Sequence, residues 1–323
     1  MFLSREIILL FGFGFIFNHL ILKSCFKFFK NNLLDNPNNR SLHIDPTPRG
    51  GGIGFIIPIF IFNFLNGLFF SWNTLSAISI CTLPVLFISL LDDKFDVPNK
   101  YRYFFQLFSA ILILRFTNPQ LDFTDNLIFY AFSIISVTAV INFTNFMDGS
   151  DGLVALCMVI IFIFLAMYLK NFPGNFILIG SLVNFLFWNW YPSKIFMGDI
   201  GSVFLGIYFT GNLLQLDSLI EITGFFCILM PIYGDAIYTL CLRFLYGHNI
   251  FKAHKLHIYQ RLFLNGISKQ KIALLYALMT LINGLIYINF GLLFGIVTAF
   301  ANFLILLYFD KKYALPFLNS KII

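Results

Sequence analysis

Long apolar runs, broken by short polar segments, are the feature that most constrains the fold of this chain. Runs such as ILLFGFGFIF and IALLYALM belong to apolar stretches that approach the ~20 residues a helix needs to cross a bilayer. Backbone polar groups in lipid must be bonded within the protein, so spanning segments are helices or the strands of a closed barrel. The runs lack the two-residue alternation of barrel strands. We therefore predict an all-α, polytopic membrane protein.

Composition and hydropathy agree with this prediction. Of the 323 residues, 59% are hydrophobic and 11% are charged, whereas soluble domains have about 25% charged residues. We predict about eleven transmembrane helices in a single integral-membrane domain over residues 1–323. The spans are predicted at about 6–25, 52–70, 74–91, 102–116, 126–143, 152–170, 175–191, 200–216, 219–243, 271–289 and 291–309.

The first span is predicted to be retained, because lysines follow it and no small-residue cleavage site is present. The net charge of +6 is typical of basic residues that orient membrane helices and contact anionic headgroups, so nucleic-acid binding is not expected. The five cysteines stand singly in apolar sequence without metal-ligand spacing, and we interpret them as small core residues.

Basic residues are distributed unequally between the two predicted faces of the membrane. If the N-terminal end lies outside, the connections after the odd-numbered spans carry nearly all lysines and arginines, and the opposite face keeps Arg5, Arg115 and Lys170. The basic face is expected to be cytoplasmic. The polar segments at 91–102, 142–152, 195–202 and 253–262 all fall on that face. We therefore expect the functional site to face the cytoplasm.

The chemistry of these polar segments suits a hard cation that bridges phosphates. Mg²⁺ prefers oxygen ligands and takes one or two carboxylates together with substrate phosphate. Asp199, between two glycines at a helix start, is the strongest candidate ligand, and Asn145 supplies a neutral oxygen. The alternative role of Asp199 is to cap its helix.

Further carboxylates end two apolar spans. Asp92 and Asp93 are adjacent, and each raises the pKa of the other unless a cation intervenes, so one is a candidate base or nucleophile-orienting group. Asp148 and Asp151 lie three residues apart and are expected to share one side of a helical turn. The structural alternatives are a solvated loop start for the first pair and turn formation for the second.

Two basic segments are candidates for phosphate binding. Arg49 stands in PTPRGGG, whose glycines allow close approach of the backbone to a ligand or to another helix. His254, His257 and Arg261 could clamp a diphosphate, and binding of anionic lipid is the alternative. Zinc is not expected, because no cysteine or third histidine is near.

The polar segments, in this order along the chain, resemble the polyprenyl-phosphate N-acetylhexosamine-1-phosphate transferase family (glycosyltransferase family 4). The resemblance covers roughly residues 33–265 and includes an eleven-span layout. It is carried by HIDPTPRGGG at 43–52, LDD at 91–93, NFTNFMDGSDG at 142–152, NWYPSKIFMGDIGS at 189–202 and HKLHIYQRL at 254–262.

The resemblance implies transfer of an N-acetylated sugar-1-phosphate from a UDP-sugar to undecaprenyl phosphate, with Mg²⁺ (or Mn²⁺) as cofactor. It assigns Mg²⁺ to Asn145 and Asp199 and catalysis to Asp92, Asp93 and Asp148. The remaining roles that it implies are nucleotide binding by Asp151, Asn189 and Phe196, and phosphate binding by Arg49, Arg102, His254, His257 and Arg261. It places the enzyme in the bacterial inner membrane, in contact with the bilayer, and allows a homodimer.

Two departures from the muramoyl-pentapeptide branch disfavour the peptidoglycan substrate. HKLHIYQ stands where that branch has three consecutive histidines, and Asp96 stands where it has a lysine. The loop HKLHIYQRL resembles the O-antigen-initiating branch more closely, so initiation of lipopolysaccharide O-antigen is expected.

Two other classes of function compete with the transferase. Pro231, Gly234 and Asp235 interrupt the ninth predicted span, and a broken helix with a buried acid is typical of an ion site in a secondary transporter. Clustering of the ionisable residues at one face argues against a transporter. A structural lipid-binding scaffold is the third reading, and it would tolerate loss of the Asp199 charge.

Overall fold

The computed structural model describes residues 2–37, 41–69, 74–95, 97–117, 126–169, 173–249 and 254–317. Asp96 lies outside these ranges. The described residues are predominantly α-helical, in agreement with the all-α prediction. The helices are α1 (Phe2–Asn32), α2 (Gly52–Phe69), α3 (Thr74–Phe95), α4 (Asn99–Phe116), α5 (Leu127–Met147), α6 (Leu153–Tyr168), α7 (Pro173–Asn189), α8 (Gly198–Leu213), α9 (Leu219–Ile228), α10 (Met230–Leu245), α11 (Ile258–Leu264), α12 (Lys269–Phe290) and α13 (Leu292–Tyr313).

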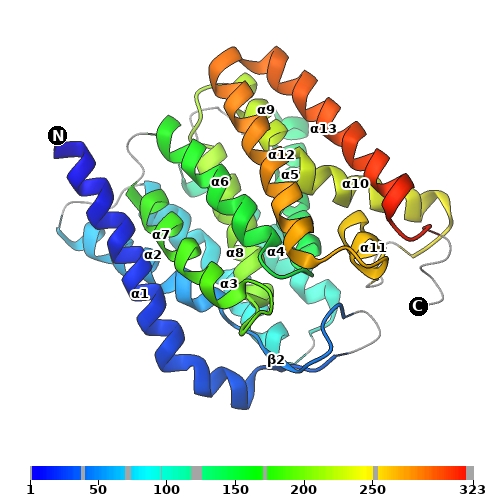
Figure 1. The fold of residues 1–323 in the computed structure, drawn as a ribbon. Helices are drawn as coiled ribbons and strands as arrows, with labels where there is room; N and C mark the ends of the chain where they lie inside the picture. Colours follow the sequence, from blue (N-terminus) through cyan, green and yellow to red (C-terminus); the bar gives the residue numbers. More distant parts are fainter. Residues whose placement is uncertain are drawn as a thin grey trace.

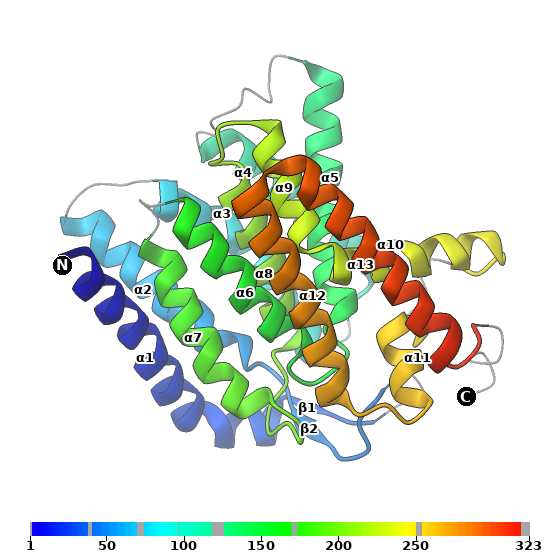
Figure 2. The ribbon, with the colours of Figure 1, turned by 45° about the horizontal axis from the view of Figure 1, so that its top comes forward.

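Helix α8 forms the centre of the bundle, and α3, α5, α2 and α6 pack around it (Figures 1 and 2). Every residue of α8 except Asp199 is buried. Such a helix is apolar on all sides because it is enclosed by other helices. Asp199, in its first turn, is therefore the polar end of an otherwise enclosed element.

Small residues allow several helices to approach closely. A side chain at Gly180 of α7 would meet the backbone of Phe11 in α1 at 2.1 Å, and one at Gly14 would meet the carbonyl oxygen of Ile177 at 2.0 Å. Contact of this kind is typical of helix pairs in membranes. It explains why α1 packs along the length of α7.

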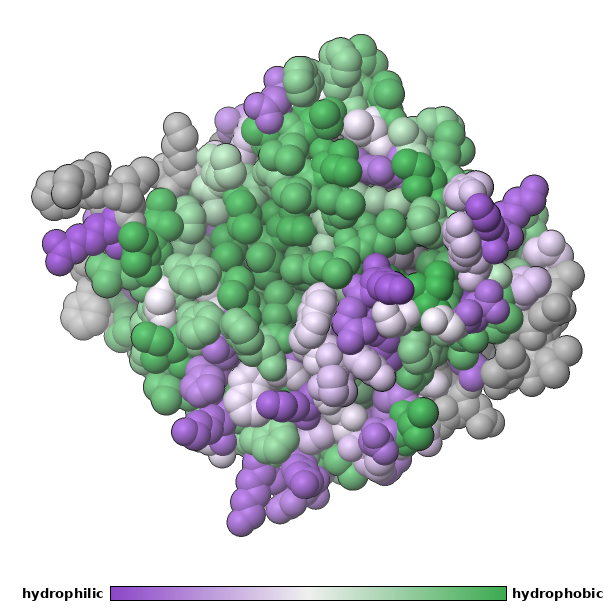
Figure 3. Space-filling model, viewed as in Figure 1, coloured by the Kyte–Doolittle hydropathy of each residue, from purple (hydrophilic) through white to green (hydrophobic). Residues whose placement is uncertain are grey.

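The membrane prediction is confirmed in its coarser form. Among the described residues, α1 from Arg5, α5, α12 and α13 are long and apolar enough to cross a membrane, and the bent pair α9–α10 would make a fifth span. Figure 3 shows apolar side chains over the body of the bundle and hydrophilic ones gathered along its lower edge. This is a multi-pass membrane protein. Each predicted apolar span contains helix, but the count of eleven spans remains a prediction.

The ninth predicted span is broken, as its proline and glycine indicated. Helices α9 and α10 meet at Leu229 with a bend of 82°. Pro231 stands in the first turn of α10, where its missing N–H costs no helical hydrogen bond. The prediction of an interrupted span at this place is correct.

A short antiparallel hairpin connects α1 to α2. Strands β1 (Leu34–Asp35) and β2 (Thr47–Pro48) pair with Leu34 opposite Pro48 and Asp35 opposite Thr47. The hairpin brings the PTPRGGG segment to the end of the bundle where α8 begins (Figure 2).

Candidate active site

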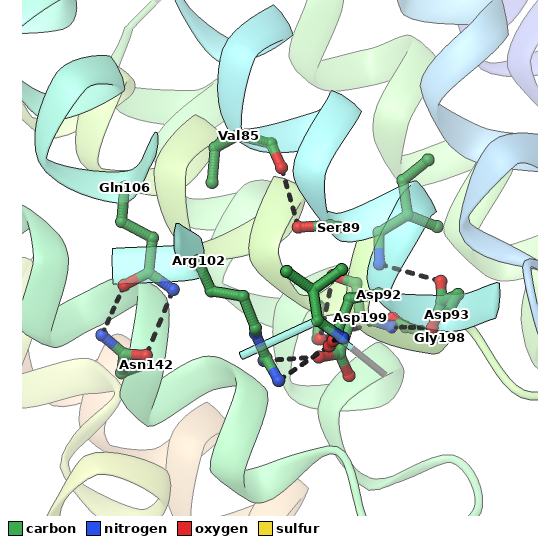
Figure 4. A network of polar contacts seen from close by, with 12 residues as sticks. Val85, Ser89, Asp92, Asp93, Arg102, Gln106, Asn142, Gly198 and Asp199 are labelled. Carbon is green, nitrogen blue, oxygen red and sulfur yellow. Dashed lines mark hydrogen bonds and ion pairs between the residues drawn. The ribbon is translucent and has the colours of Figure 1, made fainter. Parts of the chain in front are cut away.

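Three charged side chains from α3, α4 and α8 meet at the polar end of the bundle (Figure 4). The guanidinium of Arg102 bridges two carboxylates: its Nη1 lies 2.7 Å from Asp92 Oδ2, and its Nη2 lies 2.5 Å from Asp199 Oδ2. The other oxygen of Asp92 accepts the backbone N–H of Val97 at 2.7 Å. About a quarter of the Arg102 and Asp199 side chains is exposed (26% each), so a ligand can reach both.

Asp93 caps the helix that carries Asp199. Its Oδ1 accepts the backbone N–H of Asp199 at 2.9 Å, and its Oδ2 accepts that of Ile200 at 3.2 Å (Figure 4). A carboxylate is favourable at a helix N-terminus. Gly198 has φ +74, and a Cβ there would lie 2.6 Å from the Asp93 carboxylate, so only glycine fits. The cap of α8 is therefore Asp93, and the side chain of Asp199 stays free to face the site.

The carboxylates of the cluster differ in charge state. Burial, with the charge of Asp199, raises the pKa of Asp92 and of Asp93 to about 7. Burial and the charges of Asp199 and Asp93 raise the pKa of Asp148 well above its usual value. Burial opposes ionisation of Asp199 too, but Arg102, Asp92 and Arg49 outweigh it and lower the pKa of that carboxyl. Asp199 therefore loses its proton most readily, while Asp92, Asp93 and Asp148 keep theirs to higher pH.

This donor set fits a hard divalent cation at Asp199 and Asn145. The Asn145 amide favours the ionised form of Asp199, so the two side chains are neighbours, and the amide oxygen of Asn145 is a neutral ligand for such a cation. The described residues contain no group of three His, Cys, Asp or Glu side chains that could hold a metal alone. Mg²⁺ needs no such group, because it takes few protein carboxylates and completes its shell with water and phosphate.

The PTPRGGG segment lies directly against the loop that leads into α8. The backbone N–H groups of Gly51 and Gly52 donate to the carbonyl oxygens of Phe196 and Met197, at 2.9 Å each. A Cβ at Gly52 would lie 2.4 Å from Cα of Gly201, so α2 and α8 begin in contact. The glycines therefore serve helix packing, which is one of the two roles, packing and ligand contact, that the sequence allows.

Arg49 is held at the rim of the carboxylate cluster. Its Nη2 lies 2.6 Å from Asp35 Oδ1 in the hairpin, and 28% of its side chain is exposed. Burial disfavours its charge, but Asp35, with Asp93 and Asp199, raises its pKa. Arg49 and Arg102 are thus two accessible, permanently charged groups beside Asp199.

The three residues assigned to the nucleotide hold one loop, residues 190–196. The Asn189 side chain accepts the N–H of Gly152 at 2.9 Å and donates to the Ile195 carbonyl at 3.0 Å. Asp151 is buried, and its Oδ2 accepts the N–H of Ser193 at 3.2 Å. Phe196 is half-buried, and its ring meets the edge of His43 at 5.0 Å. Phe196 is thus the least buried of the three residues assigned to the nucleotide.

The segment HKLHIYQRL is held by Asp235 rather than left as an open basic clamp. The buried carboxylate of Asp235 accepts N–H bonds from Ile258 and Tyr259, at 2.8 and 3.1 Å, and a hydroxyl bond from Tyr276 at 2.7 Å. Nδ1 of the buried His257 lies 3.6 Å from it. These donors account for Asp235, so the structure gives no support to the transporter reading of the broken span.

His254 and Arg261 do not form a cationic pair facing the carboxylates. Burial lowers the pKa of His254 to about 2, and the charges of neighbouring basic groups add to this, so its ring is neutral at ordinary pH. Arg261 is 2% exposed; its Nη2 lies 2.6 Å from Asp310, and its Nε and Nη1 donate to the carbonyls of Leu256 and Leu315. The guanidinium of Arg261 therefore fastens the end of α13 to α11, and phosphate binding by these residues stays a prediction.

Comparison with known proteins bears on this site. Residues 75–217 match glycosyl transferase family 4. The matched segment of the family contains Asp92, Asp93, Asn145, Asp148 and Asp199, the carboxylate cluster and its amide neighbour.

Comparison with individual relatives extends the similarity over a larger part of the chain. The chain is 29% identical over 257 residues to a probable undecaprenyl-phosphate N-acetylglucosaminyl 1-phosphate transferase of Bacillus subtilis, which covers 73% of this chain and 71% of the relative. It is 24% identical over 289 residues to a decaprenyl-phosphate N-acetylglucosaminephosphotransferase of Mycobacterium leprae (74% and 72%). It is 35% identical over 170 residues to a phospho-N-acetylmuramoyl-pentapeptide-transferase of Carboxydothermus hydrogenoformans (50% and 51%).

Three polar partners in this structure were not singled out from the sequence. Asp35 pairs with Arg49, Lys269 pairs with Asp151 at 2.7 Å, and Gln106 pairs with Asn142. Gln106 follows Arg102 by one turn of α4, so its amide pair with α5 sets the position of Arg102. The signal for both was weak, since Gln106 is a lone polar residue within an apolar run, and Lys269 is one of several polar residues in SKQK at 268–271.

Proposed function

We propose that this protein transfers an N-acetylated sugar-1-phosphate from a UDP-sugar to undecaprenyl phosphate, giving undecaprenyl-diphospho-sugar and UMP. The observation that carries the proposal is the cluster of Asp92, Asp93, Asp148 and Asp199 with Arg49 and Arg102 at one end of the buried helix α8. A lipid phosphate and a soluble nucleotide can meet only at a membrane boundary. The family match and the names of the relatives support the same reaction.

Phosphoryl transfer depends on positioning and charge neutralisation more than on covalent catalysis. An oxygen of the lipid phosphate bonds to the sugar-linked phosphorus, and the bond from that phosphorus to the bridging oxygen breaks, leaving its electron pair on UMP. Arg49 and Arg102 are placed to meet phosphate oxygens. Asp92 orients Arg102 through their ion pair. The lipid phosphate is largely ionised near neutral pH, so this assignment of Asp92 requires no proton transfer.

The site residues fit a role for Mg²⁺ in the same reaction. Asp199 and Asn145 would hold the cation, with Mn²⁺ as its substitute. When bound, it would neutralise charge on the diphosphate. The raised pKa values of Asp92 and Asp93, both about 7, indicate a cluster that gains from an added positive charge.

We propose UDP-N-acetylglucosamine as the first donor to test, because two relatives that cover about seven-tenths of the chain carry N-acetylglucosamine in their names. The product would initiate an envelope polysaccharide. The O-antigen assignment depends on the HKLHIYQRL loop alone and stays a prediction. The proposed location is the bacterial inner membrane, with the polar end of the bundle facing the cytoplasm.

The deciding experiment measures UMP release by the purified protein. The assay contains undecaprenyl phosphate and one of several donors: UDP-N-acetylglucosamine, its deoxy relatives, or UDP-N-acetylmuramoyl-pentapeptide. Each is run with Mg²⁺, with Mn²⁺ and with EDTA. We expect metal-dependent release with one N-acetylhexosamine donor. Release with the pentapeptide donor alone would overturn the donor assignment, and no release from folded protein with any donor would overturn the proposed reaction.

A further inference from the structure

Lys269 is a buried lysine at the start of α12, at the same end of the bundle as the loops after α5 and α7 (Figures 1 and 2). Only 4% of its surface is exposed. Its Nζ lies 2.7 Å from Asp151 Oδ1 and is flanked by the rings of Phe263 and Tyr191, at 5.4 and 5.6 Å. The residues assigned to the reaction do not include it.

Stability alone gives a poor account of this lysine. A cation in the first turn of a helix opposes the helix dipole. A buried ion pair is also often no more stabilising than apolar residues of similar volume, since both charges lose their water. What the pair does supply is a defined position for the carboxylate of Asp151.

The position of Asp151 in turn fixes the loop that leads to Phe196. Asp151 Oδ2 accepts the N–H of Ser193 at 3.2 Å, in the middle of residues 190–196. The side chain of Asn189 connects the same two segments, because it accepts the N–H of Gly152 and donates to the carbonyl of Ile195. The loop continues into Phe196, whose N–H donates to the Pro48 carbonyl at 2.8 Å. Lys269, Asp151 and Ser193 thus form a continuous chain of contacts from α12 to the loop that continues into Phe196.

We propose that Lys269 is a positioning residue for the donor nucleotide, acting through Asp151 and the 190–196 loop. The inference rests on the proposed function, since it concerns the uridine end of the UDP-sugar. The proposal distinguishes the two substrates: the loop would contact the nucleotide of the donor, whereas Arg49 and Arg102 would contact phosphates. Loss of Lys269 should therefore weaken use of the donor and leave use of the lipid acceptor unchanged.

The test compares Lys269→Met with Lys271→Met. Lys271 is exposed two residues further along α12, so its variant is a matched loss of a lysine. We expect Lys269→Met to raise KM for the UDP-sugar about tenfold, as loss of a partner behind a site residue commonly does. The KM for undecaprenyl phosphate and kcat should match those of Lys271→Met. Lys269→Arg, which keeps the charge, should recover part of the donor KM.

Binding of UMP, measured by calorimetry, gives a readout independent of turnover. We expect weaker UMP binding by Lys269→Met and unchanged binding by Lys271→Met. If Lys269→Met fails to fold, Lys269→Gln, which keeps a hydrogen-bond donor beside Asp151, takes its place.

The possible results separate the two proposals. Wild-type protein without UMP release overturns the proposed function. Active wild type with equal donor KM and equal UMP affinity in the two lysine variants overturns the role of Lys269. A fall in kcat with both KM values unchanged also overturns it.

Discussion

Asp199 is the residue on which the contacts of the site converge. It alone of the α8 residues is not buried, its backbone N–H is held by Asp93, and its carboxylate meets Arg102. Because Asp93 caps the helix, the capping role that the sequence left open for Asp199 belongs to its neighbour. The Asp199 side chain therefore remains available for a ligand.

Replacing Asp199 by asparagine tests this availability. The amide keeps the shape of the side chain but removes the charge, and we expect UMP release to fall by about a hundredfold or more, as for other groups that stabilise charge in a transition state. The variant should reach the membrane and unfold at the wild-type temperature. Asp45→Asn, at an exposed aspartate in the loop before β2, is the matched control and should keep full turnover. Turnover of the Asp199 variant within a few-fold of wild type would remove Asp199 from the site.

At the scale of elements, Asp235 connects the broken span to α11. Its carboxylate, in α10, accepts the two N–H groups at the start of α11 and the hydroxyl of Tyr276 in α12. Three consecutive helices, α10, α11 and α12, are held together by one buried acid. The bend between α9 and α10 is what brings α10 to this position.

Asp235→Asn should therefore destabilise the protein. The side-chain NH2 of an asparagine would face N–H or O–H groups that donate to the carboxylate in wild type. A buried donor left without an acceptor costs about 2 kcal/mol. We expect a lower midpoint of thermal unfolding in detergent. Asp217→Asn, at an exposed aspartate before α9, should leave the midpoint unchanged. An equal midpoint for both variants would show that Asp235 does not anchor α11.

The elements were predictable from the sequence to a greater extent than their contacts. Apolar run length placed helix in each predicted span, and Pro231 and Gly234 indicated the break, because both signals are local. The pairs Arg102–Asp199 and Lys269–Asp151 join residues 97 and 118 positions apart, and they depend on how helices pack. Arg261 of α11 shows the same limit, because its ion pair with Asp310 of α13 has no signal in the local sequence.

At the scale of the whole molecule, hydrophilic residues are distributed unevenly over the face seen in Figure 3. Figure 3 shows an apolar body with hydrophilic side chains along one edge. Within the site, Asp92, Asp93 and Asp148 all have raised pKa values, while Asp199 is ionised. This surplus of acids favours the binding of a cation, and it lowers the stability of the folded protein when no cation is bound.

This arrangement predicts how stability depends on pH. A carboxyl whose pKa is higher in the folded state keeps its proton where the unfolded chain has lost it, so its contribution to stability falls as pH rises from about 4. For Asp92 and Asp93 the fall ends near pH 7, where their folded-state pKa values lie. His254, whose pKa is lowered, acts in the opposite sense: its contribution is lost as pH falls below about 6.5.

Asp148→Asn isolates one acid from this balance, because His254, Asp92 and Asp93 are common to both proteins. In EDTA, we expect the midpoint of thermal unfolding of the variant to rise relative to that of wild type as pH increases above about 4, since only in wild type does the unfolded chain release a proton from residue 148 that the folded protein keeps. A constant difference between the two midpoints across pH would contradict the raised pKa of Asp148. Mg²⁺ should raise the wild-type midpoint more at high pH than at low pH, because protons and cation compete for the same oxygens. A stabilisation by Mg²⁺ that is independent of pH would place the cation away from the carboxylate cluster.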